Sequence, residues 1–222
     1  MRRFHDRRDG GRALAKLLSR YANRPDVLVL ALPRGGVPVG YEVATALNAP
    51  LDVFVVRKLG VPGHEELAMG AIATGGVRVI NPEVVDPLGI TPEEIDSITR
   101  SELEELQRRE RLYRGDRPPP ELYNKTVILV DDGLATGSTM RAAAAAVKMQ
   151  SPARTIVAVP VAAADTCDDL RHEVDEVVCA YTPSPFHAVG LWYEHFNQTS
   201  DEEVRALLAR TQRDHAHAPG TS

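Results

Sequence analysis

Five short apolar runs constrain the fold of this chain most strongly. Each run is continuously apolar, which is typical of strands buried on both faces of a parallel sheet. Stretches with helical spacing lie between them at residues 37–47, 138–150 and 163–172. This βαβ rhythm predicts an α/β fold with a doubly wound, mostly parallel sheet. The runs are VLVLAL at 27–32, LDVFVV at 51–56, TVILV at 126–130, TIVAVP at 155–160 and EVVCAY at 176–181.

A long insertion separates the second run from the third. Its first part, residues 60–77, is rich in glycine and predicts a flexible loop or hairpin. A surface helix is then expected over 91–114, because Thr91, Pro92 and Glu94 stand at the N-cap, the first helical position and the capping-box position. The expected organisation is a core at 1–181 that contains this insertion, a C-terminal hood and helix at 182–211, and a disordered tail at 212–222.

The charge balance bears on the class of partner. The chain has 26 basic and 31 acidic residues, a net charge of −5, which disfavours nucleic acid and anionic lipid as main partners. No apolar run approaches the roughly 20 residues of a membrane helix, and no secretory apolar region is visible. The spacing of Cys167 and Cys179 matches no zinc or redox pair, so we expect reduced cysteines and a cytoplasmic location.

The stretch VILVDDGLATGSTM, residues 127–140, carries the most specific chemistry. Asp131 and Asp132 follow a predicted strand at its carboxyl end, where open α/β sheets bind ligands. The small residues that come next let the backbone approach a ligand, and the start of a helix favours a phosphate. An anion cradle beside two carboxylates predicts a ligand with a phosphate and hydroxyls, such as a sugar phosphate. The alternative is an ordinary turn with acids at a helix start.

This stretch resembles the phosphoribosyl pyrophosphate (PRPP) signature of type I phosphoribosyltransferases. It departs from that signature at Gly133, where the family usually has an aliphatic residue. Two further segments resemble parts of the same family site. LPRGG at 32–36 resembles the pyrophosphate loop, which often carries a non-proline cis peptide, and Arg57 and Lys58 resemble a basic pair that approaches the pyrophosphate. The alternatives are a plain turn and a solvated charge pair.

The resemblance implies a Rossmann-like core and a pentosyltransferase of nucleotide salvage. Such an enzyme transfers 5-phosphoribosyl from PRPP to a nucleobase or related nitrogen acceptor and releases pyrophosphate. It needs Mg²⁺, which PRPP and water mainly hold, with no direct protein ligand. The segment after Lys58 would close over the reactants. The implied catalytic residues are Asp131, Asp132, Arg57 and Lys58, and the implied substrate-binding residues are Arg34, Gly35, Gly36, Ala135, Thr136, Gly137, Ser138, Thr139, Phe186 and Trp192.

The acceptor is less well specified. Ala135 stands where hypoxanthine-guanine enzymes carry an aspartate near the purine, which argues against a 6-oxopurine. Phe186 and Trp192, in the expected hood, could stack on a nucleobase or could pack the hood onto the core. Two other functions stay open: a PRPP-sensing regulatory protein that binds nucleic acid, and a hydrolase of a phosphoribosyl compound. A homodimer is also compatible with the sequence.

Overall fold

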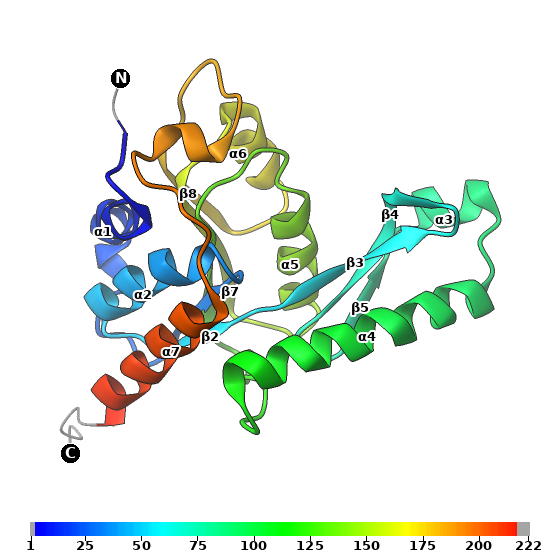
Figure 1. Cartoon of the computed structure of the whole chain (residues 1–222), viewed down its shortest axis with the longest axis horizontal. Coiled ribbons are helices and arrows are strands. Elements are labelled where there is room, and N and C mark those ends of the chain that lie inside the picture. The colour runs from blue at the N-terminus through cyan, green and yellow to red at the C-terminus, as the bar shows by residue number, and fades with distance from the viewer. Residues whose placement is uncertain (1–2, 217–222) are drawn as a thin grey trace.

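The structure, a computed structural model, describes residues 3–216, with side chains to residue 213. Its body is a five-stranded sheet in the order β2-β1-β6-β7-β8, and all neighbouring strands pair in parallel (Figure 1). The order runs outward in both directions from β1 and β6, so the topological switch point lies between these two strands. The predicted doubly wound fold is therefore confirmed. The strands are β1 (Val27–Ala31), β2 (Leu51–Val53), β6 (Thr126–Val130), β7 (Arg154–Val161) and β8 (Glu176–Tyr181).

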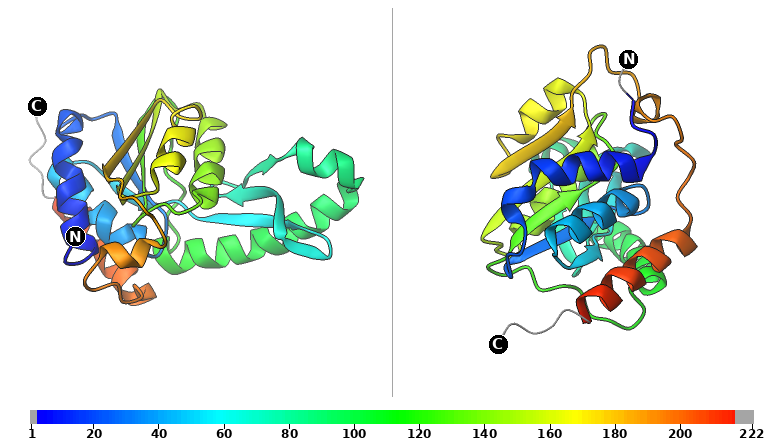
Figure 2. Two further views of the ribbon diagram at one scale, coloured as in Figure 1. Left: turned by 90° about the horizontal axis from the view of Figure 1, so that it is seen from above. Right: turned by 90° about the vertical axis from the view of Figure 1, so that its left-hand side faces the viewer.

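Helices cover both faces of the sheet, which explains why the strands are apolar throughout. Val29 of β1 packs on the side of α1 and α2, whereas its neighbour Leu30 packs on the side of α5 and α6. Figure 2 shows these two helical layers on either side of the sheet. Successive strand residues thus enter different cores. The helices are α1 (Arg7–Leu17), α2 (Gly36–Leu47), α5 (Ser138–Lys148), α6 (Ala164–Leu170) and α7 (Asp201–Ala216).

The insertion forms a projecting arm, residues 56–114, made of three antiparallel strands and two helices (Figures 1 and 2). Of the two forms expected for residues 60–77, a flexible loop or a hairpin, the structure shows the hairpin, because β3 and β4 pair antiparallel. Glycine serves close packing here: a Cβ at Gly70 would lie 2.3 Å from the Val79 carbonyl oxygen. The expected helix begins after Thr91, which forms a capping box with Glu94. The elements are β3 (Val56–Val61), β4 (His64–Ala73), β5 (Val77–Ile80), α3 (Pro82–Leu88) and α4 (Pro92–Arg114).

A buried ion pair fixes the arm to the body. Arg114, the last residue of α4, donates from Nε to both carboxylate oxygens of Asp52 at 3.2 Å. Its Nη2 donates to the Val53 carbonyl at 2.9 Å. Since Asp52 and Val53 belong to β2, this contact joins the base of the arm to the edge of the sheet.

The C-terminal part forms a hood, residues 182–198, that contains the 3₁₀ helix η2 (Val189–Trp192). Its backbone is hydrogen-bonded to the N-terminal segment, because the Phe4 N–H donates to the Trp192 carbonyl at 2.9 Å. Helix α7 follows and continues to Ala216, so the predicted disordered tail is wrong for residues 212–216. The rest of that tail, 217–222, lies outside the described residues. Between residues 3 and 216, no helix has the length and apolar character to cross a membrane.

Candidate functional site

The two aspartates lie at the carboxyl end of β6, beside the switch point of the sheet. The backbone N–H of Asp132 donates to Asp131 Oδ1 at 2.8 Å, which holds the Asp131 side chain against the backbone of Asp132. Burial raises the pKa of Asp131 well above its usual range, and the charge of Asp132 raises it further. Burial also raises the pKa of Asp132. Two carboxyl groups with raised pKa values at a strand end are a physical sign of a functional site.

The LPRGG loop packs directly against this pair, although about a hundred residues separate them in the sequence. A Cβ at Gly35 would lie 2.1 Å from Asp132 Oδ2, and one at Gly36 would lie 2.7 Å from the Val130 carbonyl oxygen. Only glycine permits so close an approach. The peptide bond between Pro33 and Arg34 is cis and non-proline, as the family resemblance implied. The structure therefore brings both glycines to the acid pair.

The loop after the acids lines a cavity of about 210 Å³ that extends from Asp131 to Met140 and includes Val189 of the hood. Gly137, with φ of 71°, is the N-cap of α5, whose first residue is Ser138. The side chains of Thr136, Ser138 and Thr139 are exposed, as the cradle interpretation requires. Backbone N–H groups at a helix start beside exposed hydroxyls suit a phosphate.

The two basic residues of β3 have different surroundings. Lys58 Nζ donates to Ser138 Oγ at 2.8 Å, which places its ammonium group next to a residue that lines this cavity. Arg57 points the other way, and its Nε donates to Glu102 of α4 at 2.7 Å. Because successive strand residues face opposite sides, one β-strand cannot deliver both cations to one site. The structure brings Lys58 to the cavity, but not Arg57.

Arg34 lies in the LPRGG loop, next to Gly35 and Gly36. Burial is the main influence on the pKa of the Tyr113 phenol in α4 and raises it to about 12, and the charge of Arg34 opposes this rise weakly. Arg34 is therefore adjacent in sequence to the glycines that contact the acid pair, but no hydrogen bond among the described residues joins its side chain to the acid pair.

The hood closes the opposite side, and its aromatic residues mainly pack it. Trp192 is 2% exposed and belongs to a cluster with Phe4 and Tyr193. Phe186 stacks on Trp192 with ring centres 6.4 Å apart. The burial of Trp192 favours packing over an open stacking platform, whereas Phe186 is half-buried and keeps one accessible side.

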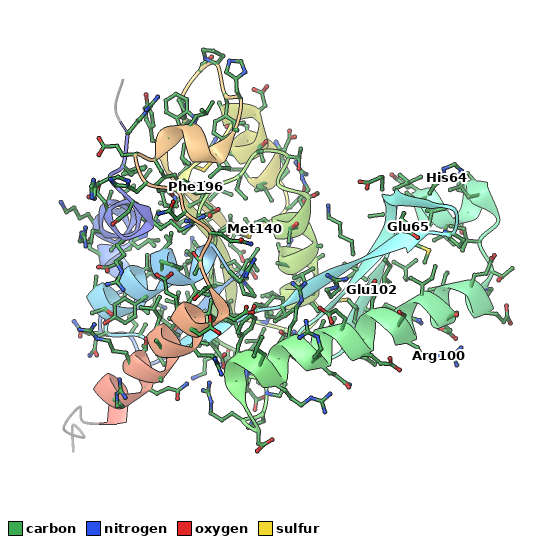
Figure 3. All side chains as sticks on the ribbon, in the orientation of Figure 1. His64, Glu65, Arg100, Glu102, Met140 and Phe196 are labelled. Atoms are coloured by element: carbon green, nitrogen blue, oxygen red, sulfur yellow. A yellow bond between two sulfur atoms is a disulfide. The ribbon has the colours of Figure 1, made fainter. Side chains whose placement is uncertain are left out.

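The expected closing segment lies elsewhere. In the structure the residues after Lys58 form the β3–β4 hairpin, and Figure 3 shows His64 and Glu65 in the arm, well away from Met140. A cavity of about 600 Å³ lies between this hairpin and α4, lined on one side by Glu65 and Glu66. The prediction that this segment covers the reactants is not met by this arrangement of the arm.

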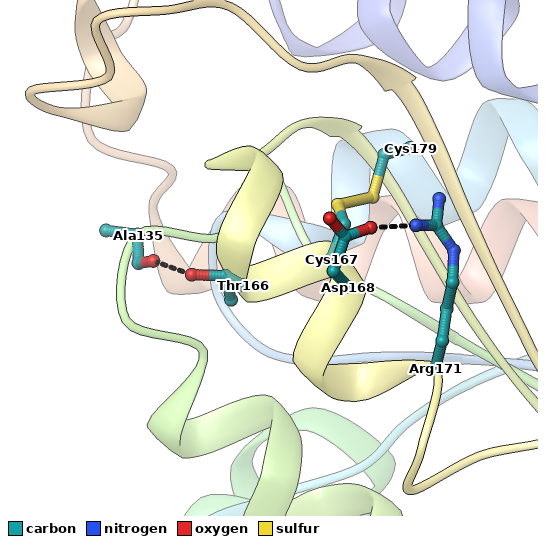
Figure 4. The surroundings of a disulfide bond; sticks show 6 residues. All are labelled: Ala135, Thr166, Cys167, Asp168, Arg171 and Cys179. Atoms are coloured by element: carbon teal, nitrogen blue, oxygen red, sulfur yellow. Dashed lines mark hydrogen bonds and ion pairs between the residues drawn. A yellow bond between two sulfur atoms is a disulfide. The ribbon is translucent and has the colours of Figure 1, made fainter.

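The prediction of reduced cysteines was wrong. Cys167 of α6 and Cys179 of β8 form a disulfide (Figure 4). The sequence spacing of the two cysteines gave no sign of the bond, which forms because α6 packs on β8 and brings the thiols together. The neighbouring residue, Thr166, donates to the Ala135 carbonyl at 2.6 Å, so α6 also supports the loop that follows the acid pair (Figure 4).

Two functional neighbours escaped the sequence reasoning. Arg7 Nε donates to Asp132 Oδ2 at 2.8 Å, and the Tyr193 hydroxyl donates to the Asp132 carbonyl at 2.6 Å. Burial raises the pKa of Tyr193, so the phenol stays protonated and donates. Both residues come from segments far from Asp132 in sequence, and no local pattern signals either contact. Across residues 3–213, no group of three or more His, Cys, Asp or Glu side chains could hold a metal ion.

Comparison with known proteins gives a consistent result. A family model described as phosphoribosyl transferase domain matches residues 4–191. The chain is 47% identical over 218 residues to "Putative phosphoribosyl transferase Rv0571c" of Mycobacterium tuberculosis, which covers 98% of this chain and 49% of that protein. It therefore spans about half the length of the curated relatives it matches. The crystal structure of TT1426 from Thermus thermophilus is 39% identical with a TM-score of 0.84, covering 95% of this chain and 99% of that one.

Proposed function

The chain belongs to the phosphoribosyl transferase family, and from that premise we propose that it transfers the 5-phosphoribosyl group of PRPP to a nitrogen acceptor. The observation that carries this proposal is the contact between Gly35 and Asp132 at the switch point of the sheet. It places the LPRGG loop, whose glycines can present backbone N–H groups to an anion, beside carboxylates that can accept hydrogen bonds from a sugar. The cavity suited to a phosphate lies on the other side of the carboxylates. PRPP has its pyrophosphate, ribose and 5′-phosphate in that same order.

Each part of the donor has a set of residues suited to it. Asp131 and Asp132 accept hydrogen bonds from the ribose 2′- and 3′-hydroxyls, and residues 135–139 bind the 5′-phosphate through N–H and hydroxyl groups. Gly35 and Gly36 present the backbone to the pyrophosphate. Lys58, beside Ser138, supplies positive charge to the bound donor.

Cleavage of the bond between ribose and pyrophosphate gives the sugar oxocarbenium character, as at other glycosidic centres. Ionised carboxylates next to the ribose stabilise the positive charge that develops there. The acceptor nitrogen then bonds to the same carbon and loses its proton to water or to the pyrophosphate, and pyrophosphate leaves with the electrons of the broken bond. Asp131 and Asp132 therefore act in binding and in catalysis.

Mg²⁺ fits this site as a cation carried by the donor. The described residues offer the acid pair but no cluster of three ligands, and Asp132 Oδ2 already accepts from Arg7. Mg²⁺ commonly keeps several waters and binds substrate phosphates with few protein ligands. When bound through PRPP oxygens and water, it would neutralise the leaving pyrophosphate.

The acceptor is proposed to be a nucleobase or a related nitrogen compound, with a role in nucleotide salvage. Ala135 lines the cavity without an acid that could take a proton from a 6-oxopurine, which favours other acceptors. A cytoplasmic location, a homodimer and the lack of a nucleic-acid partner stay predictions. No second function is favoured by a specific observation over transfer.

The test is pyrophosphate release from PRPP and Mg²⁺ with a panel of nucleobases. Release that depends on one base supports the proposal and identifies the acceptor. Release without any base would replace transfer by hydrolysis. Binding of PRPP without release under all conditions would point to a sensor, for which salt-dependent nucleic-acid binding is the next measurement.

A further inference from the structure

Arg7 contacts the acid pair but has no part in the transfer reaction proposed for the site. It is the first residue of α1, and its Nε donates to Asp132 Oδ2 at 2.8 Å. Its Nη1 donates to the Asn197 carbonyl at 2.6 Å, and its guanidinium carbon lies 3.9 Å from the centre of the Phe196 ring. One guanidinium therefore joins the N-terminal helix, the acid pair and the hood.

These contacts hold Arg7 in a preformed position. The side chains of Arg7 and Asp132 are 12% and 15% exposed, so the ion pair is largely shielded from water and salt. A carboxylate on one side, a carbonyl on another and an aromatic face leave the guanidinium little freedom. It also borders the LPRGG loop, since a Cβ at Gly35 would lie 3.4 Å from Arg7 Nε. A cation held in place thus borders both Asp132 and the LPRGG loop, which also contact each other.

The contact bears on the charge of Asp132. The groups that face this residue are Asp131 after β6, Arg7 of α1 and, at its backbone carbonyl, the Tyr193 hydroxyl of the hood. Burial raises the pKa of Asp132, and Arg7 opposes that rise. A protonated carboxyl offers fewer acceptor sites to a sugar hydroxyl than a carboxylate does. Arg7 therefore favours the form of Asp132 that can bind ribose.

We propose that Arg7 is a positioning residue of the donor site. It holds Asp132 against the LPRGG loop through Oδ2 and leaves Oδ1 to accept a ribose hydroxyl of PRPP. This inference rests on the proposed function and adds to it a residue from outside the signature. Arg7 acts through Asp132 and takes no part in bond breaking.

The experiment compares three variants with the unaltered protein. Arg7→Met removes the charge at similar length, and Arg7→Lys keeps the charge but loses the two-point contact. Arg8→Met is the matched control, because Arg8 is 40% exposed and contacts Glu42, at 3.9 Å, and the Tyr41 ring. Calorimetry gives the Kd for PRPP with Mg²⁺ between pH 5 and 8, pyrophosphate release gives KM and kcat, and thermal unfolding checks the fold.

The expected result is a loss of PRPP affinity on the order of 10- to 100-fold for Arg7→Met, since small displacements of a binding group have effects of this size. The PRPP affinity of Arg7→Lys should lie between those of Arg7→Met and the unaltered protein, and Arg8→Met should bind PRPP as tightly as the unaltered protein. The rise of affinity with pH should also move to higher pH in Arg7→Met, a change that a purely structural role would not produce.

Equal affinity and an equal pH profile in Arg7→Met and the unaltered protein would overturn the inference. If Arg7→Met does not fold, Arg7→Lys carries the test, and unchanged PRPP affinity and pH profile in that variant would overturn it as well. Absence of PRPP binding by the unaltered protein is a different result, because it contradicts the proposed function itself.

Discussion

Val189 of the hood occupies the space that a side chain at Gly133 would need. A Cβ at residue 133 would lie 2.5 Å from Val189 Cγ1 and 3.0 Å from Val161 Cγ1. The departure from the family signature at this position is therefore a packing requirement, because the hood closes directly onto the motif. Glycine here serves the contact between hood and site.

Gly133→Ala should destabilise the protein by about 1–3 kcal/mol, as overpacking of a filled site does. Val189→Ala removes the nearest methyl group, so the double variant should recover part of that loss. Urea unfolding of the single and double variants measures both effects. Additive destabilisation by the two changes would show that the hood does not meet Gly133 in this way.

Asp131→Asn should stabilise the ligand-free protein at neutral pH. Burial raises the pKa of Asp131 above its unfolded value, so between the two values the folded state binds more protons than the unfolded state. The free energy of unfolding therefore falls as pH rises through that window, and the loss persists above it. Asparagine keeps an acceptor for the Asp132 N–H but carries no charge.

Urea unfolding at pH 4, 5.5 and 7 checks this prediction. The stability advantage of Asp131→Asn over the unaltered protein should be smallest at pH 4 and grow toward pH 7. An advantage that is the same at all three pH values would contradict it.

Arg114→Met should destabilise the protein by roughly 3–5 kcal/mol, because it leaves the buried carboxylate of Asp52 without its cation. Arg114 is 2% exposed on its side chain, so solvent cannot replace the lost partner. Arg111→Met, an exposed position on the same helix, is the control and should change stability little. Equal unfolding midpoints for the two variants would show that the arm is not anchored through Arg114.

The disulfide predicts that thiol labelling under denaturing conditions finds no free cysteine without reductant, and finds both Cys167 and Cys179 after reduction. Reduction should lower the free energy of unfolding by about 2–3 kcal/mol, since the closed loop is short. Mass spectrometry of the alkylated protein gives the labelling, and urea unfolding gives the stability. Full labelling of freshly purified protein without reductant would contradict the pairing.

The sequence predicted the body of the fold because each strand is apolar on both faces and each helix follows in turn. It left the arm open between a flexible loop and a hairpin, since its glycines fit both and His64 to Leu67, which are all exposed, show no alternation. The acids and the phosphate loop formed a local pattern. Arg7 did not, because it meets Asp132 across 125 residues of chain, and only tertiary structure joins them.

The direct test of the central claim is the turnover of Asp132→Asn in pyrophosphate release from PRPP. If Asp132 binds ribose and stabilises the transition state, kcat should fall on the order of 10²-fold or more, because one preorganised contact is lost. Glu104→Gln, an exposed acid of the arm, should keep the unaltered rate. An unaltered rate in folded Asp132→Asn would contradict the assignment of the acid pair to the donor site.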